Sequence, residues 1–365
     1  MITFVLVNYR STAEALRATE SFRSAVAAAG VEAEVIAVDN SGDGDALRSA
    51  ADRLVSPGRN LGFAGGLNAG AKASRGEVLF LGNPDLVFAP ESVRALLDAL
   101  EEAGDGTAAG PAFFHDAART LLMPPAEEPS PLELARRLLS RDPAATERVF
   151  KRNLGRVLRV HAAARARRTL RAEALSGALV AMSRVTLERV GPFDERYRLY
   201  YEENDWQRRL VRSGGRLVYA GAAHVVHRWG QSARHEPQAA AWFAESERLY
   251  FGEHFGTRGR KGLDSLAAAP PWPKSAPPLL AGRLEWPQAG PAGIAVSPLP
   301  WFSPIGWVGL PAGASIWTPP PEFADLIPGP CYVRAVGITS AKVLAEATIA
   351  PRGASAAGNV RREPA

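Results

Sequence analysis

The sequence predicts an open α/β sheet with flanking helices, followed by a small, mainly-β C-terminal domain. Two observations lead to this fold class. Short apolar runs alternate with helical patterns over the first hundred residues, which calls for parallel strands joined by helical crossovers. Beyond Leu263 the composition changes, because sixteen of the 29 prolines and five of the eight tryptophans lie between Ser265 and Pro330. Proline at this density excludes long helices and favours short strands.

The N-terminal elements follow one another in a regular order. Strands are predicted at 2–9, 34–40 and 77–83, and the helices after them end near residue 29 and span 43–54 and 90–103. A glycine-rich segment that begins at Gly62 opens a further helix. In an open α/β sheet the ligand lies at the carboxyl ends of the parallel strands. We therefore expect the polar residues that follow these strands to form a site.

A basic helical insert interrupts this pattern at about residues 130–172. Between Pro131 and Ala172 twelve Arg or Lys stand against three acids, which more than accounts for the net charge of +5. A charge confined to one segment does not indicate a general affinity for nucleic acid. Two interpretations stay open: a solvated helical surface, or a peripheral contact with anionic lipid headgroups.

The remaining elements complete two predicted domains. A strand at 175–182, a helix at 203–213, a strand at 216–219 and a helix at 236–255 continue the α/β pattern. Short strands at 293–296, 305–310 and 331–338 belong to the proline-rich region. We therefore predict an α/β domain over 1–262, which contains the basic insert, and a small β domain over 263–365.

Composition also limits the compartment and the chemistry. No apolar run approaches the roughly 18 residues that cross a bilayer, and the N-terminus lacks the basic and small-residue regions of a signal peptide. We therefore expect a cytoplasmic protein. Cys331 is the single cysteine, so an internal disulfide and a cysteine-based metal site are excluded. Any metal must be held by oxygen and imidazole ligands.

Three candidate segments follow the first strands. Asp39 ends an apolar strand, so its carboxylate could accept hydrogen bonds from a ribose or base, or cap a turn, and the same alternatives hold for Asn8. Asn60 precedes the glycine segment, where a helix N-terminus offers N–H groups to an anion or a sugar. Asn83 and Asp85 flank a proline; they suit a hard divalent cation or an Asx turn.

Two further segments carry acids and histidines. Glu202, Glu203 and Asp205 start a predicted helix, where they could complement the helix dipole or deprotonate a hydroxyl. The pattern does not separate Glu203 from Asp205. His224 and His227 share one short stretch, and histidine is a common metal ligand as well as a frequent structural residue.

In their order along the chain, these segments resemble the family 2 glycosyltransferases of the GT-A fold, especially the rhamnosyltransferase-like branch. The resemblance covers Ile2 to about Phe255. Its segments are Val7-Asn8-Tyr9, Val38-Asp39-Asn40-Ser41, Asn60-Leu61-Gly62-Phe63-Ala64-Gly65-Gly66, Asn83-Pro84-Asp85, Ser176-Gly177-Ala178, Gly191-Pro192-Phe193-Asp194 and Glu202-Glu203-Asn204-Asp205. The last hundred residues stay outside it.

The resemblance implies roles for particular residues. Asp85, with Asn83 nearby, and His227 would hold Mg²⁺ or Mn²⁺ on the diphosphate of a nucleotide sugar. Glu203 fills the place of the catalytic base, where the family normally has aspartate; Glu202 and Asp205 are reserve candidates. The implied donor-binding residues are Asn8, Asp39, Asn60, Gly62, Phe63 and Asn83.

These roles imply an inverting transfer of a sugar to a hydroxyl of a cell-surface polysaccharide or a lipid-linked glycan. dTDP-rhamnose is the donor that the branch suggests, with UDP-sugars next. A lipid-linked acceptor would suit a peripheral contact at the inner face of the membrane. Two alternatives stay open: a non-catalytic protein that binds sugar nucleotides or glycans, and a sugar nucleotidyltransferase. The latter should carry a glycine-rich, basic loop after the first strand, where this chain has Asn8-Tyr9-Arg10.

Overall fold

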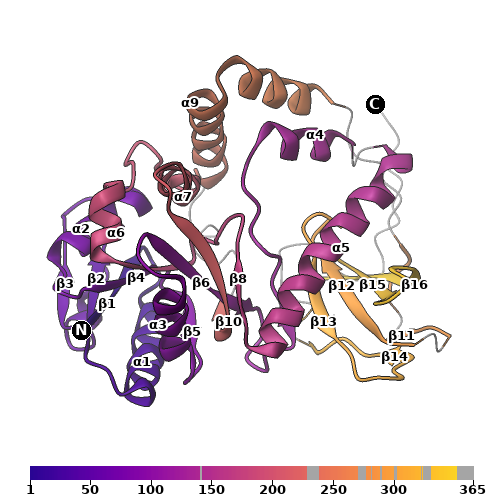
Figure 1. The fold of residues 1–365 in the computed structure, drawn as a ribbon, viewed down its shortest axis with the longest axis horizontal. Helices are drawn as coiled ribbons and strands as arrows, with labels where there is room; N and C mark the ends of the chain where they lie inside the picture. Colours follow the sequence, from indigo (N-terminus) through magenta and orange to yellow (C-terminus); the bar gives the residue numbers. More distant parts are fainter. Residues whose placement is uncertain are drawn as a thin grey trace.

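The computed structural model describes residues 1–139, 142–227, 238–269, 277–280, 282–287, 290–299, 302–321, 323 and 330–351. It contains a long mixed sheet with helices on both faces, and C-terminal strands extend that sheet at one end (Figure 1). The predicted fold class is therefore confirmed: an open α/β sheet with flanking helices and a mainly-β C-terminal region.

Four parallel strands form the N-terminal half of the sheet. Their order in space is β3 (Arg53–Val55), β2 (Ala33–Asp39), β1 (Ile2–Asn8) and β4 (Val78–Gly82). The crossovers contain α1 (Thr12–Ala29) and α2 (Gly62–Ala73). Because all four strands run in one direction, their carboxyl ends meet at one edge of the sheet. The predicted polar residues accordingly gather at this edge.

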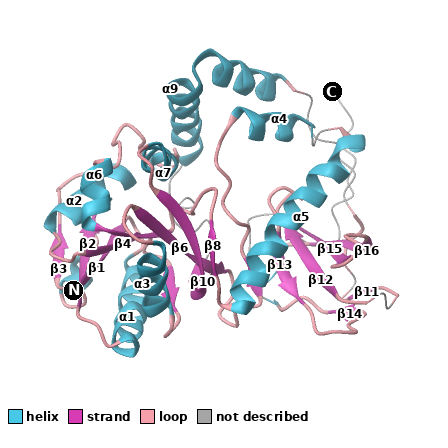
Figure 2. Cartoon of the chain, viewed as in Figure 1, coloured by secondary structure: helices cyan, strands magenta, loops and turns pink. Residues whose placement is uncertain are grey.

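Residues that alternate along β1 supply both layers of the core. Phe4 and Leu6 pack with α1 and α3 (Ser92–Ala103), which lie side by side on one face (Figure 2). Val5 and Val7 pack on the other face with α2 and α7 (Glu202–Arg212). Successive side chains of a strand point to opposite faces, and full burial of each large apolar side chain stabilises the fold by about 1.5–3 kcal/mol.

The second half of the sheet brings distant segments to the same edge. β9 (Leu179–Ser183) lies antiparallel between β4 and β6 (Thr107–Phe114), and β10 (Arg216–His227) runs parallel to β6. β5 (Leu86–Phe88) and β8 (Thr169–Arg171) both pair with β10. The register of the β5–β10 pair sets His227 opposite Leu86. The end of β10 therefore lies beside the loop that follows β4.

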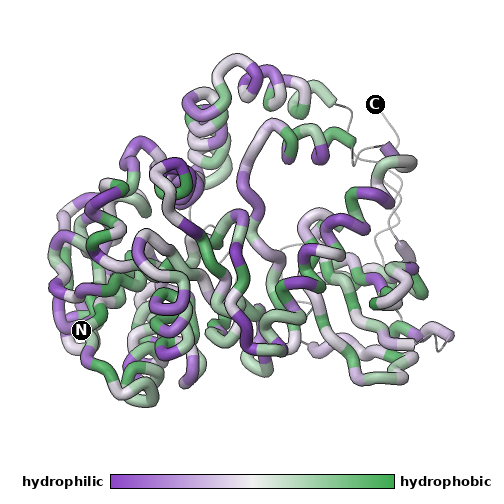
Figure 3. Tube along the Cα trace, viewed as in Figure 1, coloured by the Kyte–Doolittle hydropathy of each residue, from purple (hydrophilic) through white to green (hydrophobic). Residues whose placement is uncertain are grey.

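The basic insert packs against the C-terminal part of the sheet. It forms α4 (Pro131–Leu139) and α5 (Pro143–Ala166), and α5 buries Phe150 and Val157 against Trp307 of the C-terminal sheet. Hydrophobic and hydrophilic residues alternate along α5 (Figure 3). At least five basic side chains of the insert, on α4 and α5, pair with carboxylates of the same chain. They are Arg136, Arg137, Lys151, Arg152 and Arg156.

Hydrogen bonds carry the sheet into the C-terminal region through β7 (Leu121–Leu122), which pairs with both β6 and β13 (Gly306–Gly309). Beyond β13 the order is β12 (Ala292–Ser297), β15 (Cys331–Gly337) and β16 (Val343–Ile349). β11 (Leu284–Glu285) and β14 (Ile316–Trp317) form a separate pair. The three strands predicted in the proline-rich region thus lie within this sheet.

Helix α9 crosses the predicted domain boundary. It spans Ala239–Ala268, with a non-helical residue at Gly256, so the division between residues 262 and 263 falls inside it. Leu134 of α4 packs against Tyr250, Phe251 and Leu263 of α9. The division of the chain into two separate domains therefore stays a prediction.

Three element predictions were wrong in extent or type. The predicted helix at 43–54 is a short 3-10 helix, η1 (Asp45–Arg48), followed by β3, because the Asp39 carboxylate binds the N–H groups of Gly42 and Gly44 and holds the chain in a loop. The strand predicted to end at residue 219 continues to His227 after a register shift. The strand predicted to begin at residue 175 begins at Leu179, and it is followed by α6 (Arg184–Val190).

Within the described part of the chain, no helix combines the length and the apolar character needed to cross a bilayer.

Candidate active site

A cavity of about 290 Å³ opens at the carboxyl edge of the parallel strands. Its walls come from the ends of β1 and β4, the N-terminus of α2, the segment before β9, the N-terminus of α7, the end of β10 and α9. The predicted site residues that line it are Asn60, Gly62, Phe63, Asn83, Asp85, Glu202, Glu203 and His227. The fold therefore brings together most of the residues that the sequence singled out.

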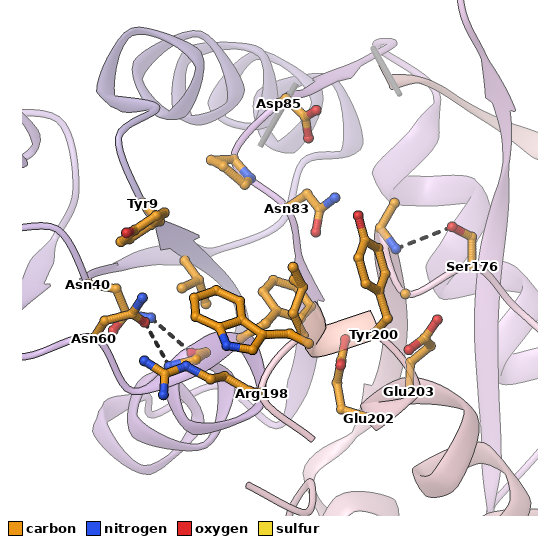
Figure 4. A pocket seen from close by; sticks show the side chains of 18 of the residues that line it. Tyr9, Asn40, Asn60, Asn83, Asp85, Ser176, Arg198, Tyr200, Glu202 and Glu203 are labelled. Carbon is orange, nitrogen blue, oxygen red and sulfur yellow. Dashed lines mark hydrogen bonds between the residues drawn. The ribbon is translucent and has the colours of Figure 1, made fainter. Parts of the chain in front are cut away.

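Asn83, Asp85 and His227 form a polar group on one side of this cavity, in which Asp85 and His227 are buried. The Nε2 atom of His227 lies 3.5 Å from Oδ1 of Asp85 and 3.3 Å from the side-chain nitrogen of Asn83. Burial raises the pKa of Asp85 and lowers the pKa of His227, since the charged form of each is poorly solvated there. Figure 4 shows Asn83 and Asp85 on the same side of the pocket.

These residues fit a divalent cation. Asp85 Oδ1 and His227 Nδ1 are buried and have no hydrogen-bond partner, so the group holds unused capacity for a ligand. A carboxylate, an amide oxygen and an imidazole leave further coordination positions for phosphate oxygens, which suits Mg²⁺ or Mn²⁺. Among the described residues no cluster of three or more His, Cys, Asp or Glu forms a complete cation cage. The substrate would therefore have to supply the remaining ligands.

Glu202 and Glu203 form a carboxyl pair on another side of the cavity (Figure 4). Each has a buried Oε2 atom without a hydrogen-bond partner. Burial, followed by the neighbouring Glu203, raises the pKa of Glu202 well above its usual value. Burial also raises the pKa of Glu203, although backbone donors and a hydrogen bond with Glu202 oppose this shift. The pair therefore ionises at higher pH than an ordinary glutamate, and once ionised it can accept a proton.

Backbone geometry aims this pair into the cavity. Tyr200 and Tyr201 both adopt the left-handed region, with φ of 66° and 69°, directly before α7 begins. Such residues are uncommon and cluster at functional sites, because surrounding contacts must offset their strain. The Tyr201 hydroxyl donates to Glu247 over 2.8 Å, and its ring packs on Tyr250. The turn that presents Glu202 and Glu203 is therefore held by α9.

Asp205 faces away from the cavity. Its Oδ1 lies 2.9 Å from His254 Nε2, and its Oδ2 accepts a hydrogen bond from Arg209 over 2.8 Å. Burial opposes ionisation, but these two partners hold the pKa of Asp205 below its usual value. Asp205 is absent from the cavity wall, so the structure separates it from Glu203, which the sequence pattern did not.

Asn8 and Asp39 lie next to the site but do not line the cavity. The Asn8 amide donates to Asp39 over 3.1 Å and to Asp43 over 3.0 Å. Burial would raise the pKa of Asp39, but N–H donors led by Gly44 lower it below the usual range. Both side chains therefore organise the loop after β2. Their direct contact with a nucleoside stays a prediction.

Several other lining residues were given no role from the sequence. They are Tyr9, Asn40, Arg198, Tyr200 and Trp242. Asn40 donates to the carbonyl of Gly62 over 2.9 Å, and the Arg198 guanidinium lies 4.5 Å from the Trp242 ring centroid. Tyr9 and Asn40 were within reach of the strand-end rule because they follow β1 and β2. Arg198 and Trp242 carried no local signal, since only tertiary contacts bring them here.

An open α/β sheet that holds polar and acidic residues in a cavity at the carboxyl edge of its parallel strands is the architecture of nucleotide-binding enzymes. Residues 3–163 match the model of the family described as glycosyl transferase family 2. The match covers less than half of the chain, and it agrees with the resemblance that the sequence motifs indicated.

Curated relatives are similar over part of the chain. N-acetylglucosaminyl-diphospho-decaprenol L-rhamnosyltransferase of Mycobacterium tuberculosis (strain ATCC 25618 / H37Rv) is 27% identical over 216 residues, which cover 51% of this chain and 61% of that protein. Succinoglycan biosynthesis protein ExoO of Rhizobium meliloti (strain 1021) is 35% identical over 109 residues, which cover 28% of this chain and 30% of that protein. The chain thus spans less than two thirds of each relative.

Solved structures show a distant likeness. Mannosyltransferase PcManGT from Pyrobaculum calidifontis, in complex with GDP-Man and Mn²⁺, superposes with a TM-score of 0.42 and 16% identity over 74% of this chain and 76% of that chain. S. aureus TarS 1–349 gives a TM-score of 0.42 and 12% identity over 73% of this chain and 70% of that chain.

Proposed function

We propose that this protein is a metal-dependent, inverting glycosyltransferase that moves a sugar from a nucleoside diphosphate to a hydroxyl group. One observation carries the proposal: the Asp85–His227 pair and the Glu202–Glu203 pair line the same cavity, each with unpartnered buried atoms. The first pair supplies ligands for a cation and the second a proton acceptor. The match of residues 3–163 to the glycosyl transferase family 2 model supports the assignment.

Asp85 and His227 would hold the cation, with Asn83 beside them. When bound, Mg²⁺ or Mn²⁺ would neutralise charge that develops on the departing nucleoside diphosphate. Asn60, Gly62 and Phe63 line the part of the cavity at the N-terminus of α2, where the positive end of the helix dipole favours an anion. These residues would contact the donor.

Glu203 would act as the general base. Its carboxylate takes the proton of the acceptor hydroxyl, whose oxygen attacks the anomeric carbon while the bond to the diphosphate oxygen breaks. Attack opposite to the leaving group inverts the configuration. Because burial raises the pKa of both carboxyl groups, Glu202 would keep its proton and support the ionised base. The family resemblance, in which Glu203 fills the place of the catalytic base, favours Glu203 over Glu202.

The relatives suggest the donor and the acceptor. One is named an L-rhamnosyltransferase that acts on a lipid-linked N-acetylglucosaminyl diphosphate, and the other a succinoglycan biosynthesis protein. We therefore propose dTDP-rhamnose, or else a UDP-sugar, as donor. The acceptor would be a cell-surface polysaccharide or a lipid-linked glycan.

A nucleoside-diphosphate release assay tests the function. Wild-type protein is incubated with Mn²⁺ or Mg²⁺ and a panel of dTDP-, UDP- and GDP-sugars, beside the Asp85→Ala and Glu203→Gln variants. We expect metal-dependent release from one donor class that both variants lose. If no donor is turned over with any acceptor, the catalytic proposal is wrong. A donor that still raises the melting temperature would then support a non-catalytic binding protein.

The peripheral membrane contact is a separate proposal. It rests on the basic insert, where each Lys or Arg near an anionic surface adds on the order of 1 kcal/mol. Internal ion pairs of at least five of these side chains reduce the charge that is left for lipid. Flotation with vesicles that contain 30% anionic lipid, compared with neutral vesicles, tests this contact. Equal recovery with both would contradict it.

A further inference from the structure

A second cavity, of about 590 Å³, adjoins the one described above. The two share Ser176, Tyr200, Glu203 and His227. Its other walls come from the loop after β7, α4, α5, α9 and the segment between β12 and β13. The Glu203 carboxyl group therefore stands between two compartments, and the proposed function uses only the first.

The charges in this second cavity disfavour an anionic ligand. Arg137 is held by Glu133 and, at 3.4 Å, by Glu247. Arg156 is held by Glu127 at 3.1 Å, and it also donates to the backbone carbonyl of Ala126 over 2.7 Å. Both arginines of the wall are thus neutralised within the chain. A phosphate or carboxylate that entered would also meet the carboxyl groups of Glu127, Glu133 and Glu203.

Two carboxyl oxygens of this cavity have no hydrogen-bond partner, and such acceptors suit a ligand rich in hydroxyl groups. Oε2 of Glu133 and Oε2 of Glu203 are buried and have no partner. A buried carboxyl oxygen without a partner costs free energy unless a ligand or water satisfies it. Glu133 lies on α4, and Glu203 lies at the start of α7. The two groups therefore reach the cavity from separate elements.

Aromatic rings complete this chemistry. Tyr200 and Phe243 keep exposed fractions of 36% and 37%, although both are large apolar side chains. Their ring centroids lie 5.5 Å apart with the planes at 69°. Exposed aromatic surface inside a cavity offers an apolar contact for the C–H face of a sugar ring, while the surrounding oxygens bind its hydroxyls.

We propose that this second cavity binds the acceptor, and that it takes the neutral, hydroxyl-bearing end of a glycan. Glu133 binds a hydroxyl of that glycan, and Phe243 packs on its ring. Leu299, Ser303, Pro304 and Ile305 of the C-terminal region close the far wall. The inference rests on the proposed function, since Glu203 is the base for a hydroxyl delivered from this side. It gives the insert and the C-terminal strands a role in acceptor choice.

Direct binding tests the inference without turnover. Methyl glycosides of glucose, galactose, N-acetylglucosamine and rhamnose are titrated into the full chain with UDP and Mn²⁺ present, beside glucose 6-phosphate and methyl glucuronide. Saturation-transfer NMR reports contact, and calorimetry gives Kd. We expect neutral glycosides to bind in preference to anionic ones. Glu133→Gln and Phe243→Ala should each weaken binding about tenfold, the effect of losing one charge-assisted hydrogen bond or one aromatic contact.

Glu147→Gln is the matched control, because Glu147 lies on the same insert in an exposed pair with Lys151. Its glycoside affinity should equal that of wild type. Where turnover is measurable, Glu133→Gln should raise the acceptor KM, whereas Glu203→Gln should lower kcat. Preference for the anionic sugars, or unchanged affinity in both Glu133→Gln and Phe243→Ala, would overturn the inference. Glycoside binding that depends on Glu133 in a protein that turns over no donor would instead remove the proposed function alone.

Discussion

The backbone of Gly177 lies directly against the side chain of Glu203. A Cβ atom at Gly177 would stand 2.8 Å from Cγ and 3.0 Å from Cδ of Glu203, closer than van der Waals contact allows. Ser176-Gly177-Ala178 therefore fixes one side of the candidate base, and α7 fixes the other. The position of the carboxyl group is set by two segments that meet only in the folded chain.

Gly177→Ala should displace Glu203 without removing any catalytic atom. A shift of about 1 Å in a reacting group can cost about 100-fold in rate, so we expect kcat to fall about 10- to 100-fold. Steady-state release of the nucleoside diphosphate measures this. The control is Gly155→Ala on α5, where an added Cβ meets nothing within 4 Å and the helix should gain up to about 1 kcal/mol. Equal activity of the two variants would contradict the proposed position of the base.

The pH dependence of turnover should reflect the raised pKa of the carboxyl pair. Glu203 accepts a proton only when it is ionised, and burial raises its pKa, so kcat/KM should rise with pH through that raised value. In Glu203→Gln this ionisation is absent, and kcat should fall about 100-fold or more. A pH–rate profile of both proteins at saturating Mn²⁺ checks this. A wild-type profile that is flat from pH 5 to 8 would contradict it.

Glu202→Gln should stabilise the fold at alkaline pH. A carboxyl group whose folded pKa lies above its unfolded pKa binds its proton more tightly in the native state. That stabilisation is present at low pH and is lost as pH rises through the folded pKa. Replacing the group by a neutral amide removes the loss, so the variant should exceed wild type in Tm by about 2 °C or more at pH 8. Thermal melts between pH 5 and 9 measure the difference, and a constant difference would speak against it.

Asp85→Asn should abolish metal-dependent turnover. The amide keeps the shape of the side chain but loses the charge that binds the cation, so we expect a decrease of about 100-fold or more in kcat/KM at fixed Mn²⁺. Mn²⁺ titrations of activity, with UDP binding measured in parallel, test this. Asp98→Asn is the control, since Asp98 forms an exposed pair with Arg94 on α3. If both variants behave alike, Asp85 does not hold the metal.

Asp205→Asn should affect stability more than chemistry. The lowered pKa of Asp205 stabilises the fold above its unfolded pKa, and this stabilisation is lost as pH falls through the folded value. The variant should therefore lose about 1–3 kcal/mol of unfolding free energy at pH 7 and much less at pH 3. Denaturant unfolding at the two pH values measures the effect. A kcat loss as large as that of Glu203→Gln would make Asp205 the base instead.

The sequence predicted the parts of the fold that depend on local pattern. The alternation of apolar strands and helices located β1, β2, β4 and α3, and the strand-end rule placed Asn83 and Asp85 at the cavity. It was wrong for residues 43–54, where Asp39 captures the backbone of a loop that has a helical pattern. One side chain thus outweighed a weak helix propensity.

The local sequence pattern did not predict which distant residues meet at the cavity in the folded chain. Arg198 and Trp242 line the cavity because α9 packs beside the turn before α7, and no spacing in the sequence records that contact. Glu203 and Asp205 lie two positions apart on α7, so the helix turns their side chains to nearly opposite sides, and Asp205 contacts His254 of α9. Which of the two sides faces the cavity depends on how the helices pack.

The two residues of β7 hydrogen-bond to β6 on one side and to β13 on the other. This short strand joins the C-terminal strands and the parallel strands in one hydrogen-bonded sheet, with α5 packed across the junction. The segment between β12 and β13, which lines the second cavity, belongs to the C-terminal part of that sheet. Insertions or deletions between β12 and β13 would then alter how much of a glycan fits, while the reacting centre stays in place. Selectivity for the glycan could therefore change during evolution while the catalytic residues stay the same.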